Sequence, residues 1–162
     1  MLIKVMNKNE AKRFSYQNNG YISAMISISN VEDVKNNINI DKNNVASVLF
    51  LSFDDEEKPH QLAMTKEDAT KVADFVNKYK SVVDCMVVHC EAGRSRSAGV
   101  AAAIMKYLNG DDMSIFNNGK YVPNMTCYRY TLEALFNTKA DETELKQKED
   151  INTKKWREEN DI

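Results

Sequence analysis

The sequence VVHCEAGRSRS, residues 87–97, decides the expected fold and chemistry of this chain. The apolar runs from Val45 to Phe53 and from Met86 to His89 each predict a strand covered on both faces, as in a parallel sheet. A helix is expected from about Ser95 onward, after a tight loop. A loop that enters a helix N-terminus presents unpaired backbone N–H groups and the positive end of the helix dipole. The segment therefore predicts an anion-binding site suited to a phosphate group.

The residues of this loop strengthen the prediction of a phosphate site. Gly93 allows the backbone to curl, so that its N–H groups converge on one centre. Arg96 adds a planar guanidinium that can hold two phosphate oxygens. Arg94 is expected at the rim of the site. The predicted phosphate-binding residues are Glu91, Ala92, Gly93, Arg94, Ser95 and Arg96.

Cys90 converts this phosphate site into a reactive one. A thiol at a helix N-terminus beside an arginine favours its thiolate form. A thiolate below a bound phosphate can attack phosphorus and form a covalent phosphocysteine. We expect Ser97 to donate a hydrogen bond to the sulfur, which improves it as a leaving group. His89 is expected to order the loop rather than to act as an acid or base.

The order His-Cys-x5-Arg-Ser closely resembles the signature of the cysteine-dependent protein tyrosine phosphatase superfamily, particularly its compact dual-specificity-like members. The resemblance extends from about Val45 to Phe136. It implies a phosphatase that acts on phosphotyrosine, and also on phosphoserine or phosphothreonine, without a metal or organic cofactor. The partner would then be a phosphorylated protein or peptide. The alternative is an ordinary strand–loop–helix turn that contains a buried cysteine.

The resemblance also implies a general acid on a loop that follows the preceding strand. That place is filled by Phe53-Asp54-Asp55-Glu56-Glu57-Lys58-Pro59, which we call the acidic loop. The Phe-x-Asp pattern followed by a proline selects Asp55 as the residue that protonates the leaving group. Asp54 is the alternative acid, or a residue that steadies the loop. Four consecutive acidic residues also fit a solvated loop.

Pro123-Asn124 is a third point of similarity. In compact members of the superfamily such a pair begins the next helix, and the asparagine helps to brace the phosphate-binding loop. The pair also fits a plain helix start, because Pro is favoured in the first turn and Asn is a good cap.

Strands and helices alternate along the chain, which predicts an α/β fold. The expected sheet is central and mostly parallel, with about four to five strands flanked by helices, as in protein tyrosine phosphatases. The expected strands are Ile3 to Met6, Ile22 to Ser29 with one apolar face, Val45 to Phe53 and Met86 to His89. The expected helices are Asn9 to Phe14, Thr65 to Tyr79, Ser95 to Leu108 and Pro123-Asn124 to Phe136.

The composition changes after Thr138. We assign residues 1–138 to the phosphatase domain and residues 139–162 to a charged C-terminal helix or tail. A loosely docked helix is the preferred interpretation of this segment, with Trp156 as its anchor.

The composition excludes several classes of function. The 162 residues carry a net charge of −2 and no basic cluster, so a nucleic-acid partner is not expected. No apolar stretch reaches the length of a membrane span, and the apolar start is too short for a signal peptide. Three cysteines without metal-ligand spacing suit a reducing compartment, which predicts a cytoplasmic protein without a metal site. The sequence does not indicate an oligomeric state.

Two rival functions remain open. The first is another enzyme at the same site, acting on phosphoinositides or phosphorylated RNA ends. Glu91 argues against a lipid substrate, because phosphoinositide phosphatases of this superfamily usually carry basic residues at both positions flanking Ala-Gly. The second is a pseudophosphatase that binds phosphopeptides without turnover. Cys85 could form a protective disulfide with Cys90, although a small apolar role is the preferred interpretation.

Overall fold

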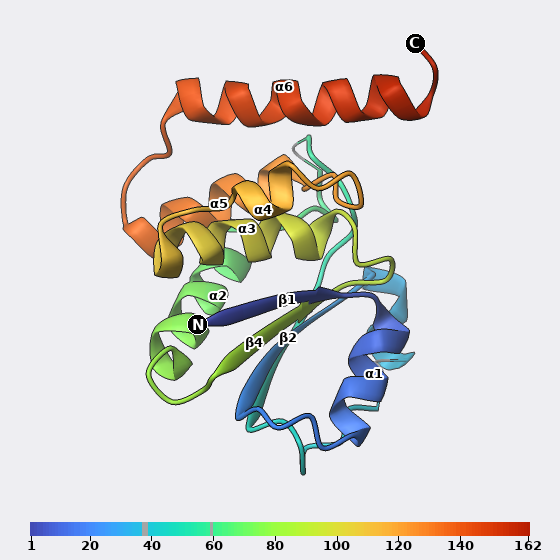
Figure 1. Cartoon of the computed structure of the whole chain (residues 1–162), viewed down its shortest axis with the longest axis vertical. Helices are drawn as coiled ribbons and strands as arrows, with labels where there is room; N and C mark the ends of the chain where they lie inside the picture. Colours follow the sequence, from blue (N-terminus) through green and yellow to red (C-terminus); the bar gives the residue numbers. More distant parts are fainter. Residues whose placement is uncertain (37–38, 59) are drawn as a thin grey trace.

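The structure, a computed structural model, describes residues 1–36, 39–58 and 60–162 (Figure 1). Its centre is a sheet of four parallel strands in the order β1-β4-β2-β3. The strands are β1 (Leu2–Met6), β2 (Ser23–Ser29), β3 (Ser47–Ser52) and β4 (Cys85–His89). The helices are α1 (Lys8–Tyr16), the short 3₁₀ helix η1 (Val31–Asn36), α2 (Lys66–Tyr79), α3 (Arg96–Asn109), α4 (Met113–Phe116), α5 (Met125–Phe136) and α6 (Glu142–Glu159). The predicted α/β fold is confirmed.

Local sequence signals place several helix ends where they were expected. Thr65 caps α2 through a reciprocal capping box, because its hydroxyl accepts from the Asp68 N–H and the Asp68 carboxylate accepts from the Thr65 N–H. Helix α3 ends at Gly110, whose φ of 79° is a left-handed conformation that glycine adopts without strain.

Helices cover both faces of the sheet. Helices α2, α3 and α5 form the larger layer on one face, and α1 lies on the other (Figure 1). Helices α3 and α5 approach very closely at Gly99, where a Cβ atom would lie 2.5 Å from the Asn124 carbonyl oxygen. This approach fixes the start of α5 relative to the start of α3, and both helix starts contribute to the site described below.

Two expectations about the strands are wrong. Ile22 was predicted to share a buried face with the alternate residues of β2, but it lies before the strand and is 57% exposed. Instead Met25, on the opposite face of β2, is fully buried, because α1 covers that face. The run from Val45 to Phe53 was predicted to be covered on both faces. Strand β3 lies at the sheet edge, however, and its Phe50 is 41% exposed.

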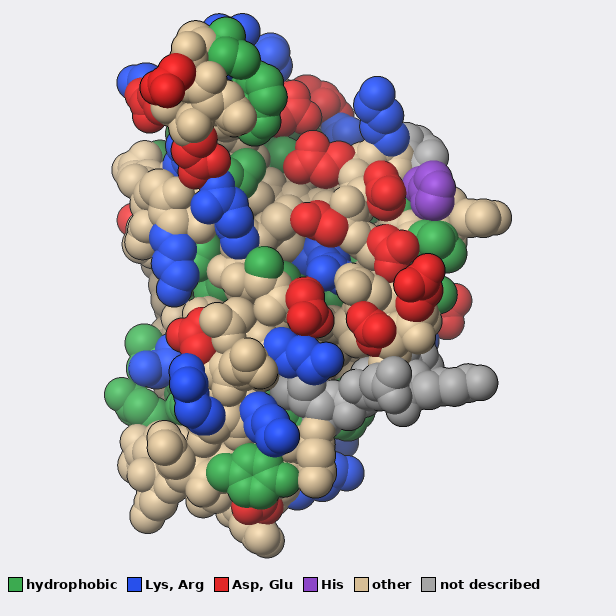
Figure 2. Space-filling view, turned by 90° about the vertical axis from the view of Figure 1, so that its right-hand side faces the viewer, with side chains coloured by type: hydrophobic (Ala, Val, Ile, Leu, Met, Phe, Trp, Pro, Cys, Tyr) green, Lys and Arg blue, Asp and Glu red, His purple; other side chains and the backbone are tan. Residues whose placement is uncertain are grey.

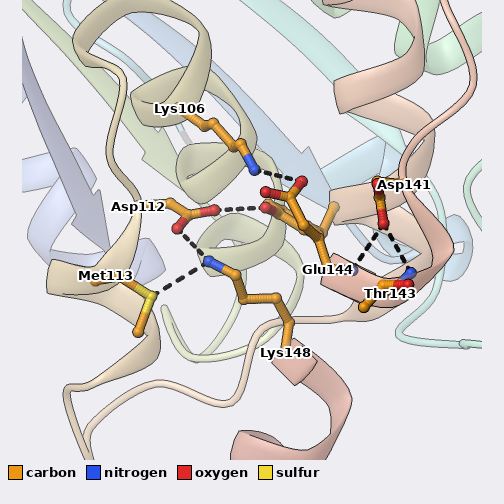
Figure 3. A network of polar contacts seen from close by, with 8 residues as sticks. Lys106, Asp112, Met113, Asp141, Thr143, Glu144 and Lys148 are labelled. Atoms are coloured by element: carbon orange, nitrogen blue, oxygen red, sulfur yellow. Dashed lines mark hydrogen bonds and ion pairs between the residues drawn. The ribbon is translucent and has the colours of Figure 1, made fainter. Parts of the chain in front are cut away.

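Helix α6 docks through buried polar side chains. Lys148 is 8% exposed and forms an ion pair with Asp112 (Figure 3). The Asp112 carboxylate also accepts a hydrogen bond from Tyr128. Lys106 of α3 donates to Glu144 at 2.8 Å (Figure 3). Leu145 and Asn152 of α6 are also buried. The predicted anchor is therefore wrong: Trp156 is 54% exposed, since the surface beneath α6 offers polar partners to the helix.

Candidate active site

The carboxyl ends of the parallel strands bring the predicted residues to one edge of the sheet. Cys90 follows β4, and residues 90–96, the phosphate-binding loop, run from there into the first turn of α3. Phe53 and the acidic loop follow β3, while Asn30 follows β2. Figure 2 shows the face at these strand ends, where Asp and Glu side chains gather across the middle.

The phosphate-binding loop is packed against the end of β1. Gly93 has a φ of 65°, and a Cβ atom there would lie 2.5 Å from the Asn7 backbone nitrogen. Only glycine satisfies both conditions without displacing β1. The Lys8 N–H at the start of α1 also donates to the Glu91 carbonyl oxygen at 3.2 Å. The curled loop predicted from Gly93 is therefore present.

Cys90 lies at the bottom of the loop and is 2% exposed. Its sulfur is 3.1 Å from the Ser97 hydroxyl oxygen, within hydrogen-bond distance. When the sulfur is a thiolate, it can only accept, so Ser97 must be the donor. The contact predicted between these two side chains is thus present in the structure.

His89 holds the loop from beneath. Its Nδ1 lies 3.2 Å from the Cys90 carbonyl oxygen, and its Nε2 lies 2.6 Å from the Ser27 hydroxyl. Because a carbonyl only accepts, Nδ1 carries the proton and Nε2 accepts from Ser27. Burial lowers the pKa of His89 to about 4 despite the Cys90 carbonyl, which acts in the opposite direction. The ring is neutral at physiological pH and has an ordering position, as expected.

Arg96 is 5% exposed and is fixed at one end of its guanidinium. Its Nη1 donates to Asn30 Oδ1 at 2.7 Å and to the Phe53 carbonyl oxygen at 2.9 Å. Its Nε is buried and has no hydrogen-bond partner among the described residues. A buried donor without an acceptor is costly. A phosphate oxygen held in the loop would provide that acceptor.

Asp55 is connected directly to the phosphate-binding loop. Its Oδ1 accepts from the Ser95 hydroxyl and from Asn124 Nδ2, both at 2.8 Å. Asn124 is also the N-cap of α5, where its side chain accepts from the Cys127 N–H. Its own N–H donates to the Ser95 carbonyl oxygen at 3.0 Å. Both interpretations of Asn124, the helix start and the brace, hold together.

The rest of the acidic loop holds Asp55 in place. Asp54 Oδ1 accepts from the Val31 N–H at 3.0 Å, which gives Asp54 the steadying position rather than the one beside the phosphate-binding loop. Glu57 Oε1 accepts from the Met125 N–H at the start of α5. A carboxylate at a helix N-terminus is favoured by the helix dipole. Pro59, which helped to select Asp55, lies outside the described residues.

The two variable loop positions differ in charge and in partners. Glu91 is exposed and lies 4.0 Å from Lys8. Arg94, at the rim as expected, forms an ion pair with Glu159 near the end of α6. Ala92, between Glu91 and Gly93, is also exposed.

The residues that hold the loop from other elements were not predicted from the sequence. These are Asn30 beside Arg96, Ser27 beside His89 and Glu159 beside Arg94. Asn30 follows β2 directly, and its place at a strand carboxyl end is the one signal that could have identified it.

The other two cysteines take no part in the site. Cys85 begins β4 and Cys90 follows its end, so their Cα atoms are about 15 Å apart along an extended strand. A disulfide needs Cα atoms within about 7 Å, so the protective disulfide is excluded in this fold. Burial raises the pKa of Cys85 to about 11, which favours its unreactive thiol form. Cys127 is fully buried in the core.

Within the described residues, no three His, Cys, Asp or Glu side chains are grouped so that they could hold a metal ion. The described helices also include none with the length and apolar character that a bilayer crossing requires.

Comparison with known proteins supports the fold. No family model and no curated protein matches the sequence. Among solved structures, the human tyrosine phosphatase-like serine/threonine/tyrosine-interacting protein matches with a TM-score of 0.55 at 16% identity, over 93% of this chain and 91% of that chain. PTPMT1 in complex with PI(5)P matches with a TM-score of 0.47 at 19% identity, over 97% and 94% of the two chains. A mutant form of Tk-PTP matches with a TM-score of 0.43 at 15% identity, over 99% and 93%. The match with a TM-score of 0.55 shows that the chain has a tyrosine phosphatase-like fold.

Proposed function

We propose that the protein is a metal-independent phosphatase that hydrolyses phosphate monoesters on protein side chains, with phosphotyrosine as the main substrate. The observation that carries this proposal is the hydrogen bond between Ser95 and Asp55 at 2.8 Å. It joins the acidic loop to the rim of the phosphate-binding loop, whose base holds Cys90. This contact brings the proposed acid, the proposed anion site and the proposed nucleophile together at one loop.

In the first step, the Cys90 thiolate attacks phosphorus, and the S–P bond forms as the bond to the leaving oxygen breaks. Asp55 gives its proton to that oxygen, so the phenol or alcohol leaves neutral. Arg96 and the loop N–H groups hold the charge on the remaining phosphoryl oxygens. Asn30 and the Phe53 carbonyl group keep the guanidinium of Arg96 in place for this role.

In the second step, water attacks the phosphocysteine and releases inorganic phosphate. Asp55, now a carboxylate, takes a proton from the water. The S–P bond breaks and returns Cys90 to the thiolate form. Ser97, at 3.1 Å from the sulfur, stabilises the thiolate as it leaves.

The charges around the site support a phosphorylated protein as the substrate. Glu91 and the acidic loop place carboxylates around the opening, which disfavours polyanionic phosphoinositides and RNA ends. Arg94, the half-buried arginine of the phosphate-binding loop, is paired with Glu159, which competes with a second phosphate for its guanidinium. Phosphoserine and phosphothreonine are included as substrates because a compact chain suggests a shallow pocket, which shorter phosphorylated side chains can also reach. Free, buried cysteines fit a reducing compartment, so we place the protein in the cytoplasm.

The rival proposal is a binding module that holds phosphopeptides without hydrolysing them. The structurally similar human protein with the TM-score of 0.55 is described as a tyrosine phosphatase-like interacting protein, which is consistent with this rival. The presence of Cys90, Arg96 and Asp55 around one loop favours the enzyme.

Hydrolysis of an aryl phosphate and of phosphotyrosine, phosphoserine and phosphoinositide substrates in EDTA tests the proposal. The wild-type protein should be compared with Cys90→Ser, Asp55→Asn and the neighbouring control Asp54→Asn. We expect turnover in EDTA that is abolished by Cys90→Ser, falls at least about 100-fold in Asp55→Asn, and falls far less in Asp54→Asn. Binding of phosphopeptides without any turnover would favour the binding module.

A further inference from the structure

A groove runs between helix α6, the acidic loop and the start of α5. It encloses about 320 Å³, a volume suited to one side chain with part of its backbone. We call it the α6 groove. Its lining residues are Glu57, Val122, Met125, Glu149, Asn152, Thr153 and Trp156.

The α6 groove lies beside the mouth of the candidate active site. Glu57 comes two residues after Asp55 and binds the Met125 N–H at 3.1 Å. The Val122 N–H donates to the carbonyl oxygen of Arg94 in the phosphate-binding loop at 3.1 Å. A peptide with its phosphate in that loop can therefore reach the groove.

Helix α6 is held firmly enough to form one wall. Asn152 Nδ2, which is buried, donates to the Pro123 carbonyl oxygen at 2.9 Å. Lys155 Nζ donates to the Tyr121 carbonyl oxygen at 2.7 Å, and Glu159 pairs with Arg94. These contacts join α6 to the segment that leads into α5 and to the phosphate-binding loop.

The two carboxylates in the lining of the α6 groove favour a cationic ligand. Glu57 and Glu149 are both exposed, and neither forms an ion pair with a lysine or arginine among the described residues. No basic side chain lines the groove. Trp156 is 54% exposed although it is a large aromatic residue, and its ring offers the face that best attracts a guanidinium. Val122 and Met125 can contact the methylene groups of a long basic side chain.

We propose that the α6 groove binds an arginine side chain of the phosphorylated protein substrate, at a position close to the phosphorylated residue. The inference rests on the proposed function and adds a sequence preference to it. The guanidinium stacks on Trp156 and pairs with Glu149 and Glu57. Helix α6 then provides the preference for a substrate sequence, while the loops at the carboxyl ends of the strands provide the proposed catalytic residues.

Trp156 provides a direct test, because it is the single tryptophan of the chain. The Cys90→Ser protein should be titrated with phosphotyrosine peptides in which one arginine is moved residue by residue across the phosphotyrosine. Matched peptides carry alanine or glutamate instead. We expect one arginine position to change the tryptophan fluorescence and to tighten binding roughly fivefold over alanine, with the glutamate peptide binding more weakly. High salt should reduce the difference.

Substitutions in the α6 groove test whether the preference for arginine arises there. Glu149→Gln and Trp156→Ala should each remove most of the preference for arginine, with peptide affinity measured by the anisotropy of a labelled peptide. Glu158→Gln, on the same helix but outside the groove, should keep it. In the Cys90-containing background, neither groove variant should change the hydrolysis of a small aryl phosphate.

Equal affinity for the arginine, alanine and glutamate peptides at every position would overturn the groove assignment. A preference that persists in the Glu149→Gln/Trp156→Ala double variant would also overturn it. Both results leave the phosphatase proposal intact if the aryl phosphate is hydrolysed. Failure of the wild type to hydrolyse any substrate overturns the phosphatase proposal, while the binding data still decide the groove. A fluorescence change with phosphoinositide vesicles but not with arginine peptides contradicts the proposed occupant.

Discussion

Asn124 Nδ2 donates a hydrogen bond of 2.8 Å to Asp55 Oδ1, although 69 residues separate the two along the chain. The same carboxylate oxygen accepts from Ser95 in the phosphate-binding loop. The phosphate-binding loop and the start of α5 therefore both bind the same oxygen atom of the acidic loop. This convergence favours Asp55 over Asp54 as the proposed general acid, because Asp54 binds the Val31 N–H instead.

Replacing Asn124 with serine should slow the protonation of the leaving group. Serine keeps the N-cap of α5 but lacks the amide that positions Asp55, so the fold should be retained. We expect kcat/KM to fall about tenfold for a phosphoserine peptide, whose leaving group needs the proton most, and to fall less for an activated aryl phosphate. An equal loss on both substrates would show that Asn124 acts through the loop as a whole and not through the acid.

Replacing Glu159 with glutamine should release Arg94. An exposed ion pair is weak and screened by salt, so the stability of the protein should hardly change. The freed guanidinium can then bind a second phosphate. We expect hydrolysis of doubly phosphorylated peptides to rise about two- to fivefold at low salt, with no change for a simple aryl phosphate. The Glu159→Gln/Arg94→Ala double variant should lose the gain. A gain that survives in the double variant would disprove the role given to Arg94.

Replacing Lys148 with methionine should destabilise the protein. The change leaves the Asp112 carboxylate buried without its cation, which costs about 3 kcal/mol in the free energy of unfolding. Denaturant unfolding measures this loss. Adding Asp112→Leu should recover much of it, because a buried pair can be replaced by apolar side chains at little cost. A single variant as stable as the wild type would show that α6 does not depend on this pair.

His89 should make the protein less stable as the pH falls. Its pKa is about 4 in the folded state, below the value of about 6.5 expected in the unfolded chain. The unfolded state therefore binds more protons between these two values, and stability is lost as the pH falls from about 6.5 towards 4. The loss attributable to His89 is about 3 kcal/mol.

Urea unfolding across this pH range tests the assignment. A His89→Gln variant should be less stable at neutral pH but should show a flatter dependence on pH than the wild type. His60, the other histidine, is exposed, so His60→Gln should follow the wild-type curve. Parallel curves for His89→Gln and the wild type would contradict the low pKa of the buried ring.

The local parts of the fold could be predicted from the sequence. The capping box at Thr65, the left-handed stop at Gly110 and the curled loop at Gly93 depend on a few neighbouring residues. The order of strands in the sheet depends instead on crossovers between distant segments. This explains why β3, an apolar run, was expected to be covered on both faces although it lies at the edge of the sheet with Phe50 exposed.

The site likewise combines contacts between neighbouring residues, which could be predicted, with contacts between distant segments, which could not. Cys90, Arg96 and Ser97 lie in one short segment, so their juxtaposition could be predicted. Asn30 binds Arg96 across 66 residues, and Lys148 pairs with Asp112 across 36. No local pattern indicates such partners. The misplaced anchor Trp156 has a related cause, because its size suggested burial while the docking surface of α6 selects polar groups.

Trapping the covalent intermediate tests the proposed phosphocysteine mechanism directly. The wild-type protein would be mixed with a phosphotyrosine peptide in EDTA, quenched rapidly in acid, and digested for mass spectrometry. We predict a phosphoryl group on Cys90 in the wild type and none in Cys90→Ser, which should also be unable to release phosphate. Phosphate release without any adduct on Cys90, or undiminished release by Cys90→Ser, would contradict the account.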